Sequence, residues 1–241
     1  MGLRTPRDGL RDAHVARTAR TVTDSVSLFI EGELRDLPFE GRAAGGCAVH
    51  PRIDVEANVG KRTLAIQYLH ATERDGESIA ALHAESWRRH YRGAYSDSYL
   101  DGDVLTDRQM VWRSRLAQPT TGHFTVVARR GDEVLGFAHT VVDEDPQWGS
   151  LLENLHVTSD LKRTGIGTLL LSHTAQNLIR LRPEGSLHLW VLDQNTAAQD
   201  FYEARGGRRV ETQRRGPFPG GGGAMGHRYH WSDPTRLLLG P

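Results

Sequence analysis

Residues 151–171 read LLENLHVTSDLKRTGIGTLLL and decide the fold that we expect for this chain. The stretch begins as an apolar strand over Leu151 to Val157, crosses a short polar turn and ends in an apolar helical run. Gly165 and Gly167 lie between the expected strand and the expected helix, and glycine lets the backbone turn sharply there without a Cβ clash. Several N–H groups are therefore expected to point outward from a helix N-terminus, where they attract phosphate.

Lys162 and Arg163 add two cations to this expected phosphate cradle. The order strand, [Gln/Arg]-x-x-Gly-x-[Gly/Ala], helix resembles the acyl-CoA-binding motif of the GNAT superfamily of N-acetyltransferases. Lys162 stands where that family usually has Gln or Arg, and lysine keeps the charge without the planar fork. The turn at residues 162–168 does not contain the glycine string of a Rossmann loop or of a Walker loop. A glycine turn that only packs the helix on the sheet is the alternative interpretation.

A second signature follows downstream of the first. The residues LHLWVL at 187–192 indicate a strand, and Asn195 is a suitable N-cap for a helix that glycines 206 and 207 end. This order is similar to the family's strand followed by Asn-x-x-Ala-x-x-(Phe)Tyr-x-x-x-Gly, with Asn195, Ala198 and Tyr202 on its positions. Two signatures in the right order are more specific than either alone.

Composition agrees with a cytoplasmic enzyme. The 241 residues hold 30 basic and 30 acidic side chains, so net charge gives no reason to expect nucleic-acid or membrane partners. No apolar run approaches the roughly 20 residues that span a bilayer, and no secretory signal is apparent. A single cysteine, Cys47, excludes an internal disulfide framework, and the histidines lack the paired spacing of a metal site.

Three segments are expected along the chain. Residues 1–62 lack sustained periodicity, which indicates a disordered extension or an over-extended gene start. Residues 63–232 match the family domain, and residues 233–241 form a C-terminal tail. A chain that begins at Val59 is accordingly expected to fold and to bind CoA. The element order β-α-α-β-β-β-α-β-α-β-β predicts an α/β (α+β) fold, with a mixed, mostly antiparallel sheet flanked by helices.

The resemblance implies direct acyl transfer from acetyl-CoA, as cosubstrate and without a metal, to a small-molecule or peptide amine. It also implies the cofactor-binding residues Leu155, His156, Val157, Lys162, Arg163, Thr164, Gly165, Ile166, Gly167, Thr168, Asn195, Ala198 and Tyr202. The first three lie on the strand along which pantetheine would pair, and a backbone N–H there would stabilise the oxyanion.

Two catalytic residues are expected, Tyr202 as general acid toward the leaving thiolate and Glu153 as general base. Counting along a regular strand places Glu153 on one face with Leu155 and Val157, and His156 on the other. A packed tyrosine and a salt-bridged glutamate are the structural alternatives.

The aromatic residues Trp87, Tyr91 and Tyr95 lie where the family's first helices wall the acceptor pocket, although aromatic residues at helical spacing also form cores. A domain that binds acyl-CoA without turnover, as a sensing or interaction module, is the alternative function. The sequence does not identify the acceptor. It is compatible with a homodimer.

Overall fold

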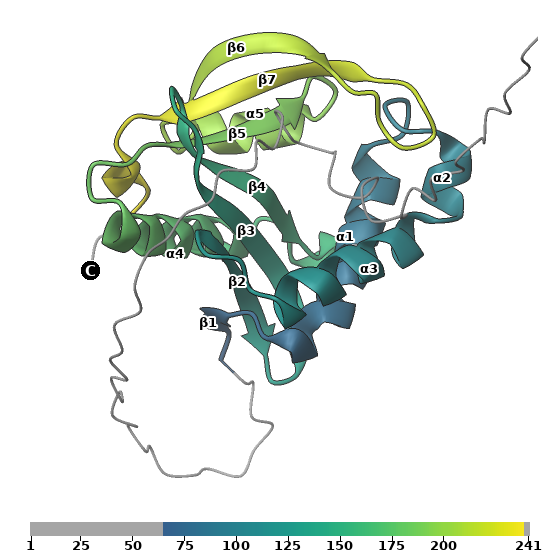
Figure 1. Cartoon of the computed structure of the whole chain (residues 1–241), viewed down its shortest axis with the longest axis horizontal. Helices are drawn as coiled ribbons and strands as arrows, with labels where there is room; N and C mark the ends of the chain where they lie inside the picture. Colours follow the sequence, from purple (N-terminus) through teal and green to yellow (C-terminus); the bar gives the residue numbers. More distant parts are fainter. Residues whose placement is uncertain (1–64, 239–241) are drawn as a thin grey trace, which may run out of the picture.

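The computed structural model describes residues 65–238, so the expected extension over residues 1–62 lies outside the described residues. The described chain forms one sheet with helices on both faces (Figure 1). Its strands are β1 (Gln67–His70), β2 (His123–Arg130), β3 (Glu133–Asp145), β4 (Gly149–Val157), β5 (Leu187–Leu192), β6 (Arg208–Arg215) and β7 (Ala224–Trp231). Its helices are α1 (Gly76–His90), α2 (Asp97–Asp101), α3 (Val104–Ala117), α4 (Ile166–Leu181) and α5 (Thr196–Glu203), with 3-10 turns η2 (Glu73–Asp75), η3 (Ser159–Leu161) and η4 (Pro234–Leu237).

The strands are arranged in the order β1-β2-β3-β4-β5-β7-β6. Every neighbouring pair is antiparallel except β4 and β5, which are parallel. A parallel pair needs a crossover connection, and α4 supplies it. The mixed, mostly antiparallel sheet expected from the sequence is therefore confirmed.

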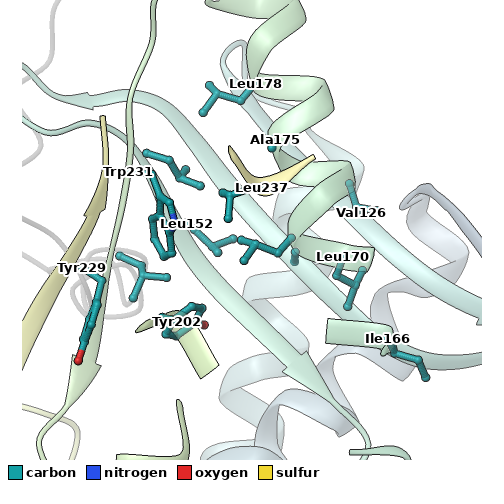
Figure 2. Packing of buried hydrophobic residues seen from close by; sticks show 14 of the residues in the cluster. Val126, Leu152, Ile166, Leu170, Ala175, Leu178, Tyr202, Tyr229, Trp231 and Leu237 are labelled. Atoms are coloured by element: carbon teal, nitrogen blue, oxygen red, sulfur yellow. The ribbon is translucent and has the colours of Figure 1, made fainter. Parts of the chain in front are cut away.

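The larger apolar cluster lies between the sheet and α4 with α5 (Figure 2). On α4 its members recur at helical spacing, as in Ile166, Leu170 and Leu178, so the helix presents one apolar stripe to the sheet. Leu237 of η4 is 5% exposed and belongs to the same cluster. The folded domain therefore extends past residue 232, the boundary expected from the sequence.

The opposite face of the sheet is covered by α1 and α3, which pack on β2 and β3. These are the two helices that the expected element order places after the first strand. The sequence analysis missed α2, a single five-residue turn whose N-cap Ser96 accepts a hydrogen bond from the Tyr99 N–H at 3.3 Å. No helix within residues 65–238 has the length and apolar character needed to cross a bilayer.

Two histidines, one on α1 and one on β3, are buried where α1 and α3 pack on the sheet. His83 is 1% exposed and accepts a hydrogen bond at Nδ1 from Trp112 Nε1 at 3.0 Å, while His139 is 2% exposed and bonds Thr125 Oγ1 at 2.8 Å. Burial lowers the pKa of His139 to about 3 and holds the pKa of His83 well below its usual value. Both imidazoles are therefore neutral in the folded protein at pH 7.

We predict that stability falls as the pH falls below about 6.5, where histidine in an unfolded chain gains a proton. The folded pKa of each histidine is depressed, so its contribution is complete above pH 6.5 and is lost progressively toward pH 3. Each histidine can remove up to about 1.4 kcal/mol per pH unit. Urea unfolding at pH 7.5 and pH 5.5 measures this loss of unfolding free energy. In His139→Asn, unfolding should take up about one proton fewer at the lower pH, so the free energy should depend less steeply on pH. Equal free energies of unfolding at the two pH values would contradict the prediction.

Candidate active site

A fork between β4 and β5 is the central feature of the candidate site. The two strands pair only at Ser150 with Leu187 and at Leu151 with His188. Beyond these pairs, within the described residues, the strands diverge toward their C-terminal ends (Figure 1). The rest of β4 therefore has a sheet neighbour, β3, on one side only, and its backbone groups on the other side face the opening.

A β-bulge interrupts β4 beside this fork. His139 of β3 pairs with Asn154, and the next residue, Thr140, pairs with Leu152, so Glu153 is the extra residue. An extra residue bends a strand and turns the following side chains to the opposite faces.

The bulge corrects the strand faces that regular alternation predicts. Glu153 does not share a face with Leu155 and Val157, which pack against the α4 cluster. Its carboxylate instead meets Arg115 of α3, on the side of the sheet where His156 also lies. Counting by twos failed because the extra residue shifts the alternation by one position.

Glu153 forms a two-pronged ion pair with Arg115. The Arg115 Nη atoms lie 2.5 and 2.8 Å from the carboxylate oxygens, and His139 Nε2 lies 3.8 Å from one of them. Burial alone would raise the pKa of Glu153, but the guanidinium outweighs it and lowers that pKa to about 2. The carboxylate is therefore ionised at neutral pH, and both of its oxygens already accept hydrogen bonds from Arg115.

His156 lies under α1. Its Nδ1 is 2.8 Å from Ser86 Oγ, and its ring packs on His83 and Phe137. Burial lowers the pKa of His156 to about 3, with His90 and positive side chains adding to the effect. The imidazole is therefore uncharged at pH 7 and serves here as a packed hydrogen-bonding group.

The expected cradle lies between β4 and α4. Arg163 and Gly165 both have positive φ, 66° and 91°, and Gly165 is the N-cap of α4. The first α4 hydrogen bond runs from Leu169 N–H to Gly165 O, which leaves earlier N–H groups of the helix without intrahelical partners. A Cβ on Gly165 would meet no atom within 4 Å, so the concave side of the turn is open. This arrangement suits an anion.

Two side chains of the cradle are already engaged. Lys162 Nζ lies 2.8 Å from His90 Nε2 at the C-terminal end of α1, and Thr164 Oγ1 donates to the Leu161 carbonyl at 2.6 Å. Lys162 thus links the cradle to α1.

Arg205 is a cradle residue that the sequence analysis missed. Its Nε donates to Thr168 Oγ1 in the first turn of α4 at 3.1 Å, and its guanidinium lies 3.7 Å from the centre of the Phe201 ring. It forms no ion pair with a residue in the described part of the chain. Its place at the end of the second signature was a signal, but only the packing of α5 beside α4 shows which element it reaches.

The second signature forms α5 as expected. Asn195 Oδ1 accepts a hydrogen bond from Ala198 N–H at 3.3 Å, so Asn195 caps the helix. Tyr202 is 7% exposed and packs in the main cluster with Tyr229 (Figure 2). Burial, and then the neighbouring Tyr91, raise the pKa of Tyr202 above its usual value of 10.0. The phenol therefore keeps its proton over the neutral range.

A pocket with aromatic walls opens between the arms of the fork and the loops above it. Its lining residues are Trp87, Tyr91, Tyr95, Asn154, Trp190, Val191, Leu192, Arg215, Phe218 and Gly226. The aromatic residues of α1 and of the turn after it therefore line a pocket. Phe218, from the β6–β7 loop, closes one wall by stacking on Tyr95 with ring centres 4.6 Å apart. Sequence spacing did not indicate Arg215 or Phe218, because strand pairing brings the first to the pocket and loop packing brings the second.

Several known proteins are similar to this chain. An uncharacterized N-acetyltransferase of Bacillus subtilis strain 168, named YuaI, is 28% identical over 138 residues, which are 56% of this chain and 76% of that protein. PaiA N-acetyltransferase from Thermoplasma acidophilum, solved in complex with coenzyme A, is 18% identical with a TM-score of 0.56, covering 70% of this chain and 100% of that one. An N-acetyltransferase structure from Staphylococcus aureus Mu50 is 14% identical with a TM-score of 0.54, covering 69% and 98%.

The structural neighbours agree with the fold, whose fork and cradle are described above. The family assignment comes from the sequence itself, because residues 80–207 match the model of the Acetyltransferase (GNAT) family. That range runs from α1 to the end of the second signature and includes both motifs. This chain belongs to the GNAT family of acetyltransferases.

Proposed function

We propose that the protein transfers an acetyl group from acetyl-CoA to a primary amine by direct attack, the amine belonging to a small molecule or a protein. The fork is the observation that carries the proposal. A cradle for phosphate follows the end of one arm, β4, and a pocket with aromatic walls opens between the two arms. Donor and acceptor could therefore approach each other within one opening.

The described residues fit the CoA donor at two places. The open turn at Gly165 and the N–H groups of Ile166, Gly167 and Thr168 suit a pyrophosphate, with Arg205 beside them. The one-sided backbone of Leu155 to Val157 suits an extended chain that pairs as a strand would. When bound, acetyl-CoA supplies an activated acyl thioester.

The chemistry that we propose uses a backbone N–H of β4 and the phenol of Tyr202. The acceptor amine, after its ammonium proton passes to water, attacks the thioester carbonyl carbon. A nitrogen–carbon bond forms, the carbon–sulfur bond breaks, and a β4 N–H stabilises the oxyanion between these events. Tyr202 donates a hydrogen bond or its proton to the leaving sulfur, a role supported by the proton that its raised pKa retains at neutral pH and by its position in the second signature.

Glu153 fits a general base poorly. A carboxylate with a pKa of about 2 accepts protons weakly at neutral pH, and Arg115 occupies both of its oxygens. We therefore propose a positioning role in which the ion pair holds α3 on β4 and so keeps the bulge beside the pocket.

A turnover screen tests the proposed function directly. Release of free thiol from acetyl-CoA is measured over polyamines, aminoglycosides, amino acids and N-terminal peptides. Amine-dependent thiol release supports transfer, whereas CoA binding without release for any amine would favour a binding module.

For the donor site, we predict that Gly165→Val raises the Kd for CoA by at least about tenfold. A β-branched residue resists the positive φ of 91° and stands in the open face of the turn. Gly221→Val is a matched control, because Gly221 also has a positive φ of 80° and open space around its Cβ position, yet lies in the β6–β7 loop. Calorimetry with CoA decides, and equal affinities of the two variants would refute the cradle.

For the acid, we predict that Tyr202→Phe lowers kcat by roughly 10- to 1000-fold with little change in CoA affinity. The ring and its packing stay while the proton is lost. Tyr229→Phe removes a phenol that donates to Glu203 at 2.6 Å instead, and should leave kcat near the parent value. An unchanged kcat in Tyr202→Phe, with chemistry shown to limit the rate, would leave Tyr202 as a packing residue.

For Glu153, we predict that Glu153→Gln lowers the free energy of unfolding by about 3 kcal/mol, because Arg115 loses its buried partner. The shape of the kcat–pH profile should stay that of the parent protein. Chemical unfolding and a rate profile from pH 6 to 9 measure the two effects. A rate loss confined to low pH, with unchanged stability, would instead assign Glu153 as the base.

A further inference from the structure

The polar groups of the aromatic pocket differ from those that a polyamine would need. None of the described residues that line the pocket is acidic, and its charged member is Arg215. Asn154 is 7% exposed, and its Oδ1 is buried without a hydrogen-bond partner within residues 65–238. The pocket therefore offers an unused acceptor on β4 and a positive charge on β6.

Arg215 reaches the pocket across the neighbouring strand. A Cβ on Gly226 of β7 would lie 2.7 Å from Arg215 Cγ, so glycine at this position leaves room for the side chain to cross. The guanidinium then lies 4.3 Å from the centre of the Trp190 ring on β5. A larger residue at position 226 would displace the arginine side chain. The position of Arg215 in the pocket therefore depends on Gly226.

The guanidinium of Arg215 has no carboxylate partner among the described residues. The acids whose charges act on it, Glu211 and Glu144, lie closer to other partners: Glu211 pairs with Arg228 at 2.8 Å, and Glu144 lies 3.1 Å from His188 Nε2. Burial and then the proximity of Arg228 lower the pKa of Arg215, and the carboxylates of Glu211 and Glu144, which form no ion pair with it, offset only part of this effect. A half-buried arginine of this kind suits a bidentate carboxylate.

The aromatic faces of the pocket are already covered. The guanidinium of Arg108 lies 4.3 Å from the centre of the Trp87 ring, Arg215 covers Trp190, and Phe218 is stacked on Tyr95. A cationic ligand would have to compete with these arginines for the rings, and it would meet the charge of Arg215. The aromatic walls therefore suit an apolar body better than a second cation.

Resting on the proposed function, we propose that the acceptor is an amine that also carries a carboxylate, as amino acids and related amino-carboxylates do. Arg215 binds the carboxylate, Asn154 Oδ1 accepts an N–H of the amine, and the apolar part of the acceptor lies against the aromatic walls.

The test compares each amino acid with its decarboxylated amine, at saturating acetyl-CoA. Suitable pairs are L-phenylalanine with 2-phenylethylamine and L-leucine with 3-methylbutylamine, with spermidine as the polyamine. Thiol release gives kcat/KM for each. We expect the carboxylate-bearing member to be favoured by about 10- to 100-fold, the effect of a charge-assisted bidentate contact. Arg215→Met should remove this preference without changing the KM for acetyl-CoA.

Two further variants separate the roles of the pocket residues. Arg214→Met removes an exposed neighbouring arginine that does not line the pocket, and it should leave the preference intact. Asn154→Leu should lower kcat/KM for both members of a pair alike, because both carry the amine. Thermal melting of each variant confirms that it is folded.

The outcomes distinguish the two proposals. Turnover of the decarboxylated amines or of spermidine as efficient as that of the amino acids would overturn the carboxylate inference and leave the acetyltransferase proposal standing. A preference that persists in Arg215→Met would also overturn it. No thiol release with any amine would overturn both.

Discussion

The parting of β4 from β5 is the constraint on which the rest of this structure depends. A parallel pair that continued to Val157 and Leu192 would satisfy its backbone groups within the sheet and would leave no opening. Because pairing stops after Leu151, the polypeptide must fill the gap with side chains and leave backbone donors for a ligand. The bulge at Glu153 falls two residues after the last pair, and the bend it brings lies where the arms separate.

The domain keeps several ionisable groups inside, and each is handled differently. Between the sheet and α3 a buried carboxylate is matched by one guanidinium, the pair of Glu153 with Arg115. The histidines beside this pair avoid the cost of a buried charge by staying neutral. Around Trp190 the protein instead places two arginines, Arg215 and Arg228, 4.3 and 4.6 Å from the ring centre, and pairs one of them with acids. The unmatched charge of the second is a structural cost that a bound anion would offset.

Local sequence signals predicted the elements that carry the donor site. The strand, the turn with its positive-φ Gly165 and the apolar helix are coded within residues 151–171, and Asn195 caps α5 as its position indicates. The short α2 was missed because a single turn has too few residues to show a period.

The features of the acceptor side depend on contacts between residues far apart in the sequence. The strand face of Glu153 follows from a register with β3, and its partner Arg115 is 38 residues away. Arg215 reaches the pocket only because β6 pairs with β7 and the side chain crosses Gly226, and Phe218 reaches it only when the β6–β7 loop packs on Tyr95. A single strand read alone contains none of this information, which is why the predicted alternation failed at the bulge.

The C-terminal turn of α1 contacts the segments that follow both arms of the fork. Lys162, which follows β4, contacts the His90 side chain, whereas Gln194, which follows β5, donates to the carbonyls of His90 and Arg92 at 2.8 and 2.9 Å. One turn earlier the same helix contributes Trp87 to the aromatic pocket. A shift of α1 would therefore move a wall of the acceptor pocket and a contact of the donor cradle at once. This shared support gives a physical reason for both substrates to meet in one geometry, because neither half of the site can move without the helix that the other half also contacts.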